Sequence, residues 1–124
     1  MRFLMIYRPA DIAAAEAGTP PTPEMMQKMG TLIEKKIGEG KLLATEGCLP
    51  TAKGSRVGLN KGKLSVMDGP FTEAKEVVAG FALFRLNSQQ EAIAEAHEFL
   101  EIAGDGEVEV RALYDQPACT DNGF

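Results

Sequence analysis

The sequence alternates between short apolar runs and longer segments in which apolar residues recur every three or four positions. Residues 3–7 form a continuous apolar run that is too short for a helix, and this run predicts a strand buried on both faces. Residues 11–23 are rich in Ala, Gly and Pro and predict a loop. Thr22 and Pro23 then suit the N-cap and the first position of a helix whose apolar stripe continues to Ile37.

Strand patterns dominate the middle of the chain. Residues 42–49 predict a short strand that Pro50 closes. Residues 56–59 and 63–67 flank a turn containing Asn, Lys and Gly, and together they predict a hairpin. Residues 77–86 also have the composition of a strand.

The last third predicts a second helix and a final strand. Residues 88–91 read Ser-Gln-Gln-Glu, a capping box in which the hydroxyl and the carboxylate each satisfy a free backbone donor at a helix start. The apolar stripe that follows ends at Gly104. The last segment, residues 108–114, has the alternation of a half-buried strand. One set of alternate positions holds Val108, Val110, Ala112 and Tyr114, and the other holds Glu109, Arg111 and Leu113.

The predicted order is strand, helix, strand, hairpin, strand, helix, strand. With right-handed crossovers, this order gives an α+β fold: a ferredoxin-like βαββαβ sheet with an inserted hairpin and both helices on one face. The other face needs a cover, and the same face of a second copy supplies one, so we expect a homodimer that encloses a space between two sheets. Residues 1–116 then form a single domain, and residues 117–124 form a loosely ordered tail.

Composition narrows the class of protein. The chain has 124 residues, of which 44% are hydrophobic and 25% charged, as in an ordinary single globular domain. Its net charge of −5 argues against nucleic acid or an anionic membrane as a partner. No apolar run is long enough for a membrane span or a signal peptide, so we expect a cytoplasmic protein. Cys48 and Cys119 lie far apart without zinc-like spacing, which predicts neither a disulfide framework nor a structural zinc site.

The densest polar segment is residues 68–76, which hold three carboxylates and one ammonium group. Pro70 fixes its own φ and restricts Gly69, so Asp68 should be held at a defined corner and Phe71 should point in a defined direction. Such rigidity suits a functional group. The alternative is that Asp68 caps its own turn and Phe71 fills the core.

This segment resembles part of a known family. It reads Asp68-Gly-Pro-Phe-Thr-Glu-Ala-Lys-Glu76, and it is followed by Gly80-Phe81 and, in the last predicted strand, by Glu109-Val-Arg111. In these motifs, and in its order of strands and helices, the chain resembles the DGPF branch of the YCII-related family over nearly its whole length. The resemblance implies a dimeric α+β barrel with ferredoxin-like subunits. The resemblance also implies a small enzyme with a His–Asp pair. Because DGPF members accompany extracytoplasmic-function sigma factors, it implies a link to such a factor as well.

The chain departs from the family pattern at two places. The early His of the His–Asp pair is absent, and Ala112 follows Arg111 where Pro is usual. His97 is the only histidine and therefore the natural substitute as general acid or base. It lies at the edge of the second helix's apolar stripe, however, and that position is typical of a partly exposed surface residue.

Arginines and lysines suggest further contacts. Arg8 ends the first strand, where a guanidinium can grip a carboxylate or phosphate. Arg111 and Glu109 lie two residues apart on one strand and predict an internal ion pair. The basic residues between 51 and 67 predict a solvated hairpin whose lysines discourage edge pairing, with docking of an acidic ligand or partner as the functional alternative.

Two hypotheses about function follow. In the first, each subunit binds or transforms a small polar molecule by cofactor-free acid–base chemistry, with Asp68 as base or anchor and His97 as a second catalytic candidate. The candidate substrate-binding residues are Arg8, Phe71, Glu73 and Lys75. No nucleotide-binding loop occurs and the carboxylates lack metal-ligand spacing, so we predict neither an organic cofactor nor a metal. In the second, the chain is a non-catalytic regulatory module that binds a protein partner, and the resemblance implies a link to a sigma factor.

Overall fold

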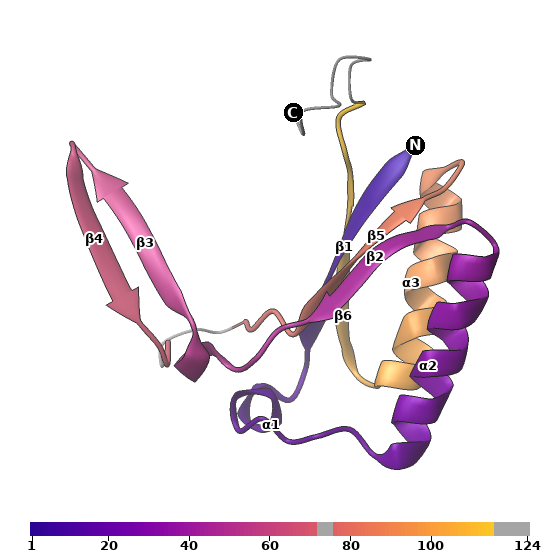
Figure 1. The fold of residues 1–124 in the computed structure, drawn as a ribbon, viewed down its shortest axis with the longest axis horizontal. Helices are drawn as coiled ribbons and strands as arrows, with labels where there is room; N and C mark the ends of the chain where they lie inside the picture. The colour runs from indigo at the N-terminus through magenta and orange to yellow at the C-terminus, as the bar shows by residue number, and fades with distance from the viewer. Residues whose placement is uncertain (72–75, 116–124) are drawn as a thin grey trace.

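The fold is described from a computed structural model, in which residues 1–71 and 76–115 are placed. A four-stranded antiparallel sheet lies beside a layer of two long helices, and a separate two-stranded hairpin extends from this body (Figure 1). The strands of the sheet are β1 (Arg2–Pro9), β2 (Leu42–Gly47), β5 (Gly80–Arg85) and β6 (Gly106–Ala112). The long helices are α2 (Pro23–Gly38) and α3 (Gln89–Ala103).

The strands lie in the order β2-β5-β1-β6, and each neighbouring pair is antiparallel. This is the strand order of a ferredoxin-like sheet, consistent with the predicted fold class. Gly80 allows β5 to approach β2 closely, because a Cβ atom there would lie 2.8 Å from the carbonyl oxygen of Glu46. The β2–β5 register shifts between Leu42 and Ala44, where β2 contains an extra residue.

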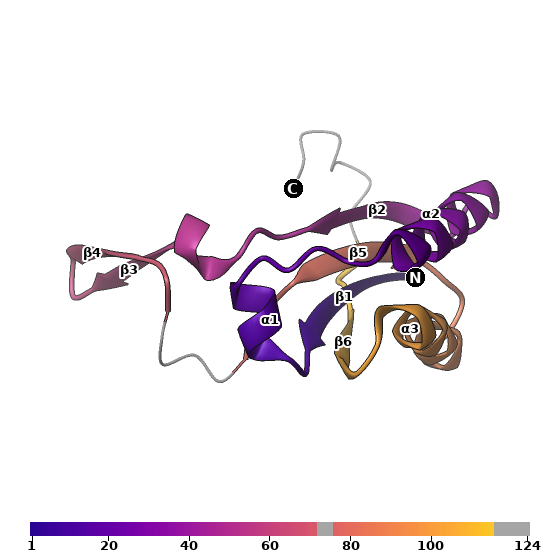
Figure 2. The ribbon, with the colours of Figure 1, turned by 90° about the horizontal axis from the view of Figure 1, so that it is seen from below.

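Both long helices cover the same face of the sheet (Figure 2). They begin at the predicted caps: the Met25 backbone N–H donates to Thr22 Oγ1 at 3.1 Å, and the Glu91 backbone N–H donates to Ser88 Oγ at 3.1 Å. Alternate residues of the central strands point toward the helices and form the core with them. The buried core residues are Phe3, Met5, Leu42, Phe84, Leu86, Ala92 and Ala96.

Neither long helix covers the opposite face of the sheet. There Leu4 lies directly opposite Leu83, and Ile6 lies directly opposite Phe81. All four side chains are at least partly exposed, and Phe81 is 37% exposed. Burial of residues 3–7 on both faces is therefore wrong for the single chain, because only the alternate side chains that point toward the helices are buried. We call Leu4, Ile6, Phe81 and Leu83 the bare sheet face.

The predicted hairpin is confirmed and consists of β3 (Ser55–Asn60) and β4 (Lys63–Asp68). Lys61 and Gly62 have φ angles of 52° and 81°, the two positive values that a type I′ turn requires. The hairpin projects away from the sheet and the helices in both views (Figures 1 and 2). We call it the arm. A short 3-10 helix, η1 (Thr51–Lys53), precedes it.

The loop predicted for residues 11–23 contains a short helix, α1 (Ile12–Glu16). Asp11 caps this helix, because its carboxylate accepts a hydrogen bond from the Ala14 backbone N–H at 3.0 Å. Three consecutive alanines, the residue with the highest helix propensity, complete its single turn.

Several strand ends differ from the predicted positions; the last strand, for example, spans Gly106–Ala112 rather than residues 108–114. Two of the differences arise because the chain leaves the sheet on its way to and from the arm. β2 ends at Gly47 rather than residue 49, and β5 begins at Gly80 rather than residue 77. The tail predicted for residues 117–124 lies outside the described residues. In the described part of the chain, no helix is long and apolar enough to cross a membrane.

Candidate functional site

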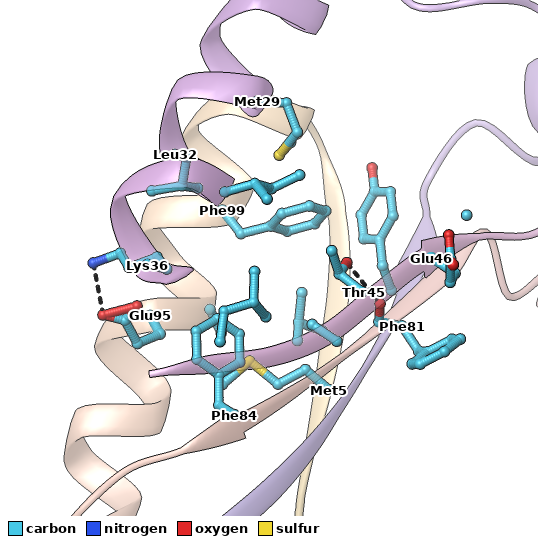
Figure 3. A pocket seen from close by; sticks show the side chains of 17 residues that line it. Met5, Met29, Leu32, Lys36, Thr45, Glu46, Phe81, Phe84, Glu95 and Phe99 are labelled. Atoms are coloured by element: carbon cyan, nitrogen blue, oxygen red, sulfur yellow. Dashed lines mark hydrogen bonds and ion pairs between the residues drawn. The ribbon is translucent and has the colours of Figure 1, made fainter. Parts of the chain in front are cut away.

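A cavity of about 390 Å³ lies between the helix layer and the sheet (Figure 3). Residues of α2 and α3 form one wall, and residues of the sheet form the other. Ala82 of β5 and Ala96 of α3 both line it, and their small side chains leave space between the two layers. The larger apolar residues of the lining are Met5, Met29, Leu32, Ile33, Phe84 and Phe99.

A buried ion pair lies at one end of the cavity (Figure 3). Lys36 Nζ is 2.8 Å from Glu95 Oε1 and 2.9 Å from Glu98 Oε1. Burial lowers the pKa of Lys36, but its hydrogen bonds to Glu95 and Glu98 outweigh burial and raise the pKa above its ordinary value. The ammonium is therefore charged and satisfied at neutral pH, and it joins α2 to α3.

The other end of the cavity carries polar groups from β1 and β2. Thr45 and the exposed carboxylate of Glu46 lie there (Figure 3). Tyr7 also lines the cavity, and its ring packs edge-on against Phe99 with 5.0 Å between ring centroids. Burial and, to a smaller extent, the Asp105 carboxylate raise the pKa of Tyr7. The phenol therefore keeps its proton at neutral pH and can donate a hydrogen bond.

The Asp68 corner lies at the base of the arm, where β4 ends, and not at the cavity. Asp68 is exposed, and its carboxylate accepts a hydrogen bond from Ser55 Oγ at 3.0 Å. It is not among the residues that line the cavity. Phe71 is half-buried, and the guanidinium carbon of Arg56 lies 4.0 Å from the centre of its ring. In the single chain, the corner thus joins the two arm strands and stacks on the arm's own arginine.

A polar cluster that the sequence did not indicate fixes the base of the arm to α1. The Thr51 backbone N–H donates to the Glu16 carboxylate at 3.1 Å, and the Thr51 hydroxyl donates to the same carboxylate. These hydrogen bonds lower the pKa of Glu16. Thr51 Oγ1 also accepts a hydrogen bond from the Phe71 backbone N–H at 3.2 Å. Gly69 is needed beside it, because a Cβ atom there would overlap the Thr51 carbonyl oxygen.

Arg8 points away from the cavity, since it follows Tyr7 on β1. Its guanidinium lies 2.8 Å from the Glu109 carboxylate and 3.7 Å from that of Glu76. The predicted pair between Arg111 and Glu109 is present at 3.0 Å. Hydrogen bonds from Arg111 and Arg8 lower the pKa of Glu109. Carboxylates of the same chain thus already occupy the guanidinium that was expected to grip a substrate.

Comparison with known proteins adds the family. The sequence model of the YCII-related domain matches residues 1–116. The chain belongs to the YCII-related family. A relative from Rhizobium meliloti (strain 1021), named "Uncharacterized protein R00369", is 32% identical over 93 residues, which span 73% of this chain and 75% of the relative. That name states no reaction, so the chemistry has to be argued from the site.

The remaining predicted residues of this YCII-related protein lie apart from the cavity or outside the described residues. His97 is on the solvent side of α3, where its side chain is 75% exposed and Nε2 lies 2.9 Å from Glu101. Its placement matches the predicted surface position and brings no acid or base to the cavity. Glu73 and Lys75 lie outside the described residues. Within residues 1–71 and 76–115, no group of three or more His, Cys, Asp or Glu side chains is arranged to hold a metal ion.

The residue pattern of this YCII-related protein did not indicate the cavity. Its lining is shared among two helices and the sheet, and each contributes residues at ordinary core spacing. An apolar stripe has the same pattern whether it meets a filled core or a hollow one. The available signal was the small size of Ala82 and Ala96, which occupy inward positions on elements that pack face to face.

Proposed function

We propose that this YCII-related protein binds a small, mostly apolar molecule in the cavity between its helices and its sheet. The cavity itself is the observation that carries the proposal, with a volume of about 390 Å³ and a largely apolar lining. Ligand pockets typically measure roughly 300 to 1,000 Å³ and combine apolar walls with a few polar groups.

The polar groups around the cavity limit the chemistry of the ligand. Lys36 and Glu95 neutralise each other, so this pair does not favour an ion. The Tyr7 hydroxyl is suited to donate to a carbonyl, hydroxyl or phenol oxygen. The ligand we propose is therefore uncharged, with an aromatic or branched aliphatic body and an oxygen near Tyr7.

Acid–base chemistry at Asp68 stays a prediction. The sequence from Asp68 to Phe71 supports placing the chain in the DGPF branch of its family. The described geometry supports binding in the cavity, and Asp68 of the same subunit does not line that cavity.

We also propose a homodimer in which a second copy covers the bare sheet face. Its four apolar side chains lie in two directly opposed pairs on β1 and β5, and so form one contiguous strip. Contiguous apolar strips are rarely left in water, and a two-fold dimer brings identical faces together.

A regulatory module that binds a protein partner is the second candidate function. The exposed apolar side chains of the arm are the observation that favours it. Binding of a small molecule distinguishes the two functions, because only the first requires the cavity to accept one.

A neutral fluorescent probe, N-phenyl-1-naphthylamine, tests the proposed function in the full chain. Its emission rises in apolar surroundings, so saturable enhancement is expected with the unmodified protein. Ala82→Leu fills part of the cavity and should weaken binding by about tenfold or more. Ala94→Leu adds the same side chain at an exposed position of α3 and should leave binding unchanged. Equal affinity in the two variants, or no binding by the unmodified protein, would contradict the proposal.

A further inference from the structure

The arm has one apolar face and one polar face. β3 and β4 pair Val57 with Val66 and Leu59 with Leu64, which places four apolar side chains on the same face. These side chains are between 60% and 73% exposed. The opposite face carries polar residues, among them Ser65. The apolar face is thus as regular as that of a strand pair packed on a core, yet it lies in solvent.

In the described part of the chain, this face of the arm stays largely exposed. The arm projects away from the sheet and the helices (Figures 1 and 2). An isolated two-stranded hairpin is marginally stable in water and usually needs a third strand or a packed surface. The apolar face of the arm therefore fits a surface outside its own chain.

The arm and the rest of the molecule carry net charges of opposite sign. Residues 55–68 carry three basic side chains and one carboxylate, a net charge of +2, in a chain whose net charge is −5. The body is correspondingly acidic, and carboxylates surround Arg8 at one end of the bare sheet face. These carboxylates are Glu76, Glu107 and Glu109. A basic arm and an acidic body in one chain attract each other between two copies of that chain.

The same basic residues favour packing of the arm's face over pairing of its edges. Lys61 and Lys63 lie at the tip of the arm, and Arg56 lies near its base. Long charged side chains on a hairpin discourage the addition of further strands along its edges. The apolar face then remains as the surface for contact.

We propose that the arms are exchanged in a two-fold symmetric dimer: the apolar face of each arm packs on the second copy of this chain, close to the carboxylates at the end of that copy's bare sheet face. Every copy supplies one arm and one body, so two reciprocal contacts form and the assembly closes at two subunits. This inference goes beyond contact between bare sheet faces, because it assigns the arm a partner. It does not depend on a ligand in the cavity.

Two neighbouring substitutions test the exchanged arm. Leu64→Glu places a carboxylate on the apolar face, and Ser65→Glu places the same group on the polar face. In sedimentation velocity, the unmodified protein and Ser65→Glu should sediment at twice the chain mass of 13.3 kDa. Leu64→Glu should raise the dimer dissociation constant by about tenfold or more. A monomeric unmodified protein, or equal dissociation constants for the two variants, would overturn the proposal.

Cross-linking of the unmodified protein keeps the test independent of how Leu64→Glu folds. Protein labelled with nitrogen-15 is mixed with unlabelled protein until subunits exchange, and a carbodiimide then joins neighbouring amines and carboxylates. We expect linked peptides between Lys61 or Lys63 and body carboxylates such as Glu107, in which one peptide is labelled and the other is not. If arm lysines are linked only within one isotopic form, or not at all, the arm is not exchanged.

Discussion

Lys36 of α2 and Glu95 of α3 form an ion pair at 2.8 Å beside the cavity, and each side chain is only 7% exposed. Because both groups are charged and satisfied, the pair holds the two helices together and adds no net charge to the cavity. The stability of the helix layer and the shape of the proposed ligand site therefore depend on the same contact.

Replacing one partner of this pair should be costly. Lys36→Met leaves the Glu95 carboxylate buried without its cation, and we expect a loss of about 3 to 5 kcal/mol in the free energy of unfolding. Lys36→Met combined with Glu95→Leu should recover part of this loss, because no unpaired charge remains buried. Urea unfolding measures both. A double variant less stable than Lys36→Met would show that the pair is not held as described.

Acid should weaken the fold through its paired carboxylates. The hydrogen bond from Lys36 lowers the pKa of Glu98, and those from Arg111 and Arg8 lower the pKa of Glu109, both from an ordinary value of 4.5. A carboxylate with a lowered folded-state pKa contributes stability above its unfolded pKa and loses it as pH falls through the folded-state value. The free energy of unfolding should therefore drop below pH 4.5, and it should drop less steeply in Glu109→Gln. Identical acid profiles for both proteins would exclude Glu109 as a contributor.

The sequence predicts the elements of this fold well where local chemistry decides them. Thr22 and Ser88 accept the cap hydrogen bonds that their positions indicate, and the turn at Lys61 and Gly62 closes the predicted hairpin. These features depend on neighbouring residues in the chain and on well-known backbone preferences. The helix α1 was missed because the glycine and prolines that follow it outweighed its short alanine run.

The site was harder to predict, because it depends on contacts between distant residues. Nothing in the sequence indicates that Glu16 accepts hydrogen bonds from Thr51, since 35 positions separate them. The rigid Asp68 corner was expected to hold a functional group, but its position follows from where the arm leaves the body. Periodicity identifies the inward positions of a helix or strand, and only the packed layers show which of them enclose a space.

Substitutions at the Asp68 corner should distinguish the roles of Asp68 and Phe71. Asp68→Asn retains an acceptor for Ser55 and should leave stability and N-phenyl-1-naphthylamine binding nearly unchanged. Phe71→Ala removes a half-buried ring stacked under Arg56 and should cost about 1 to 2 kcal/mol, less than a fully buried phenylalanine. Thermal unfolding and probe titration of both variants check these values. Loss of probe binding in Asp68→Asn alone would instead bring Asp68 into the site.

Tyr7 should favour ligands that carry an oxygen atom able to accept a hydrogen bond. In the unmodified protein, p-cresol should bind more tightly than toluene, because its oxygen can accept a hydrogen bond from the Tyr7 hydroxyl. Tyr7→Phe should weaken p-cresol binding about 3- to 10-fold, and toluene binding should change little. Calorimetric titration with both compounds measures the difference. Equal losses for the two compounds would show that Tyr7 contributes ring packing and not a hydrogen bond.

Methyl resonances of the methionines test most directly whether the cavity receives a ligand. Met5 and Met29 line the cavity, whereas Met26 on α2 and Met67 in the arm are 55% and 50% exposed. With carbon-13-labelled methionine methyl groups, titration with p-cresol should shift the Met5 and Met29 resonances along one saturable curve. The Met26 and Met67 resonances should stay in place. If Met5 and Met29 do not shift, or if all four shift alike without saturation, the cavity is not the binding site.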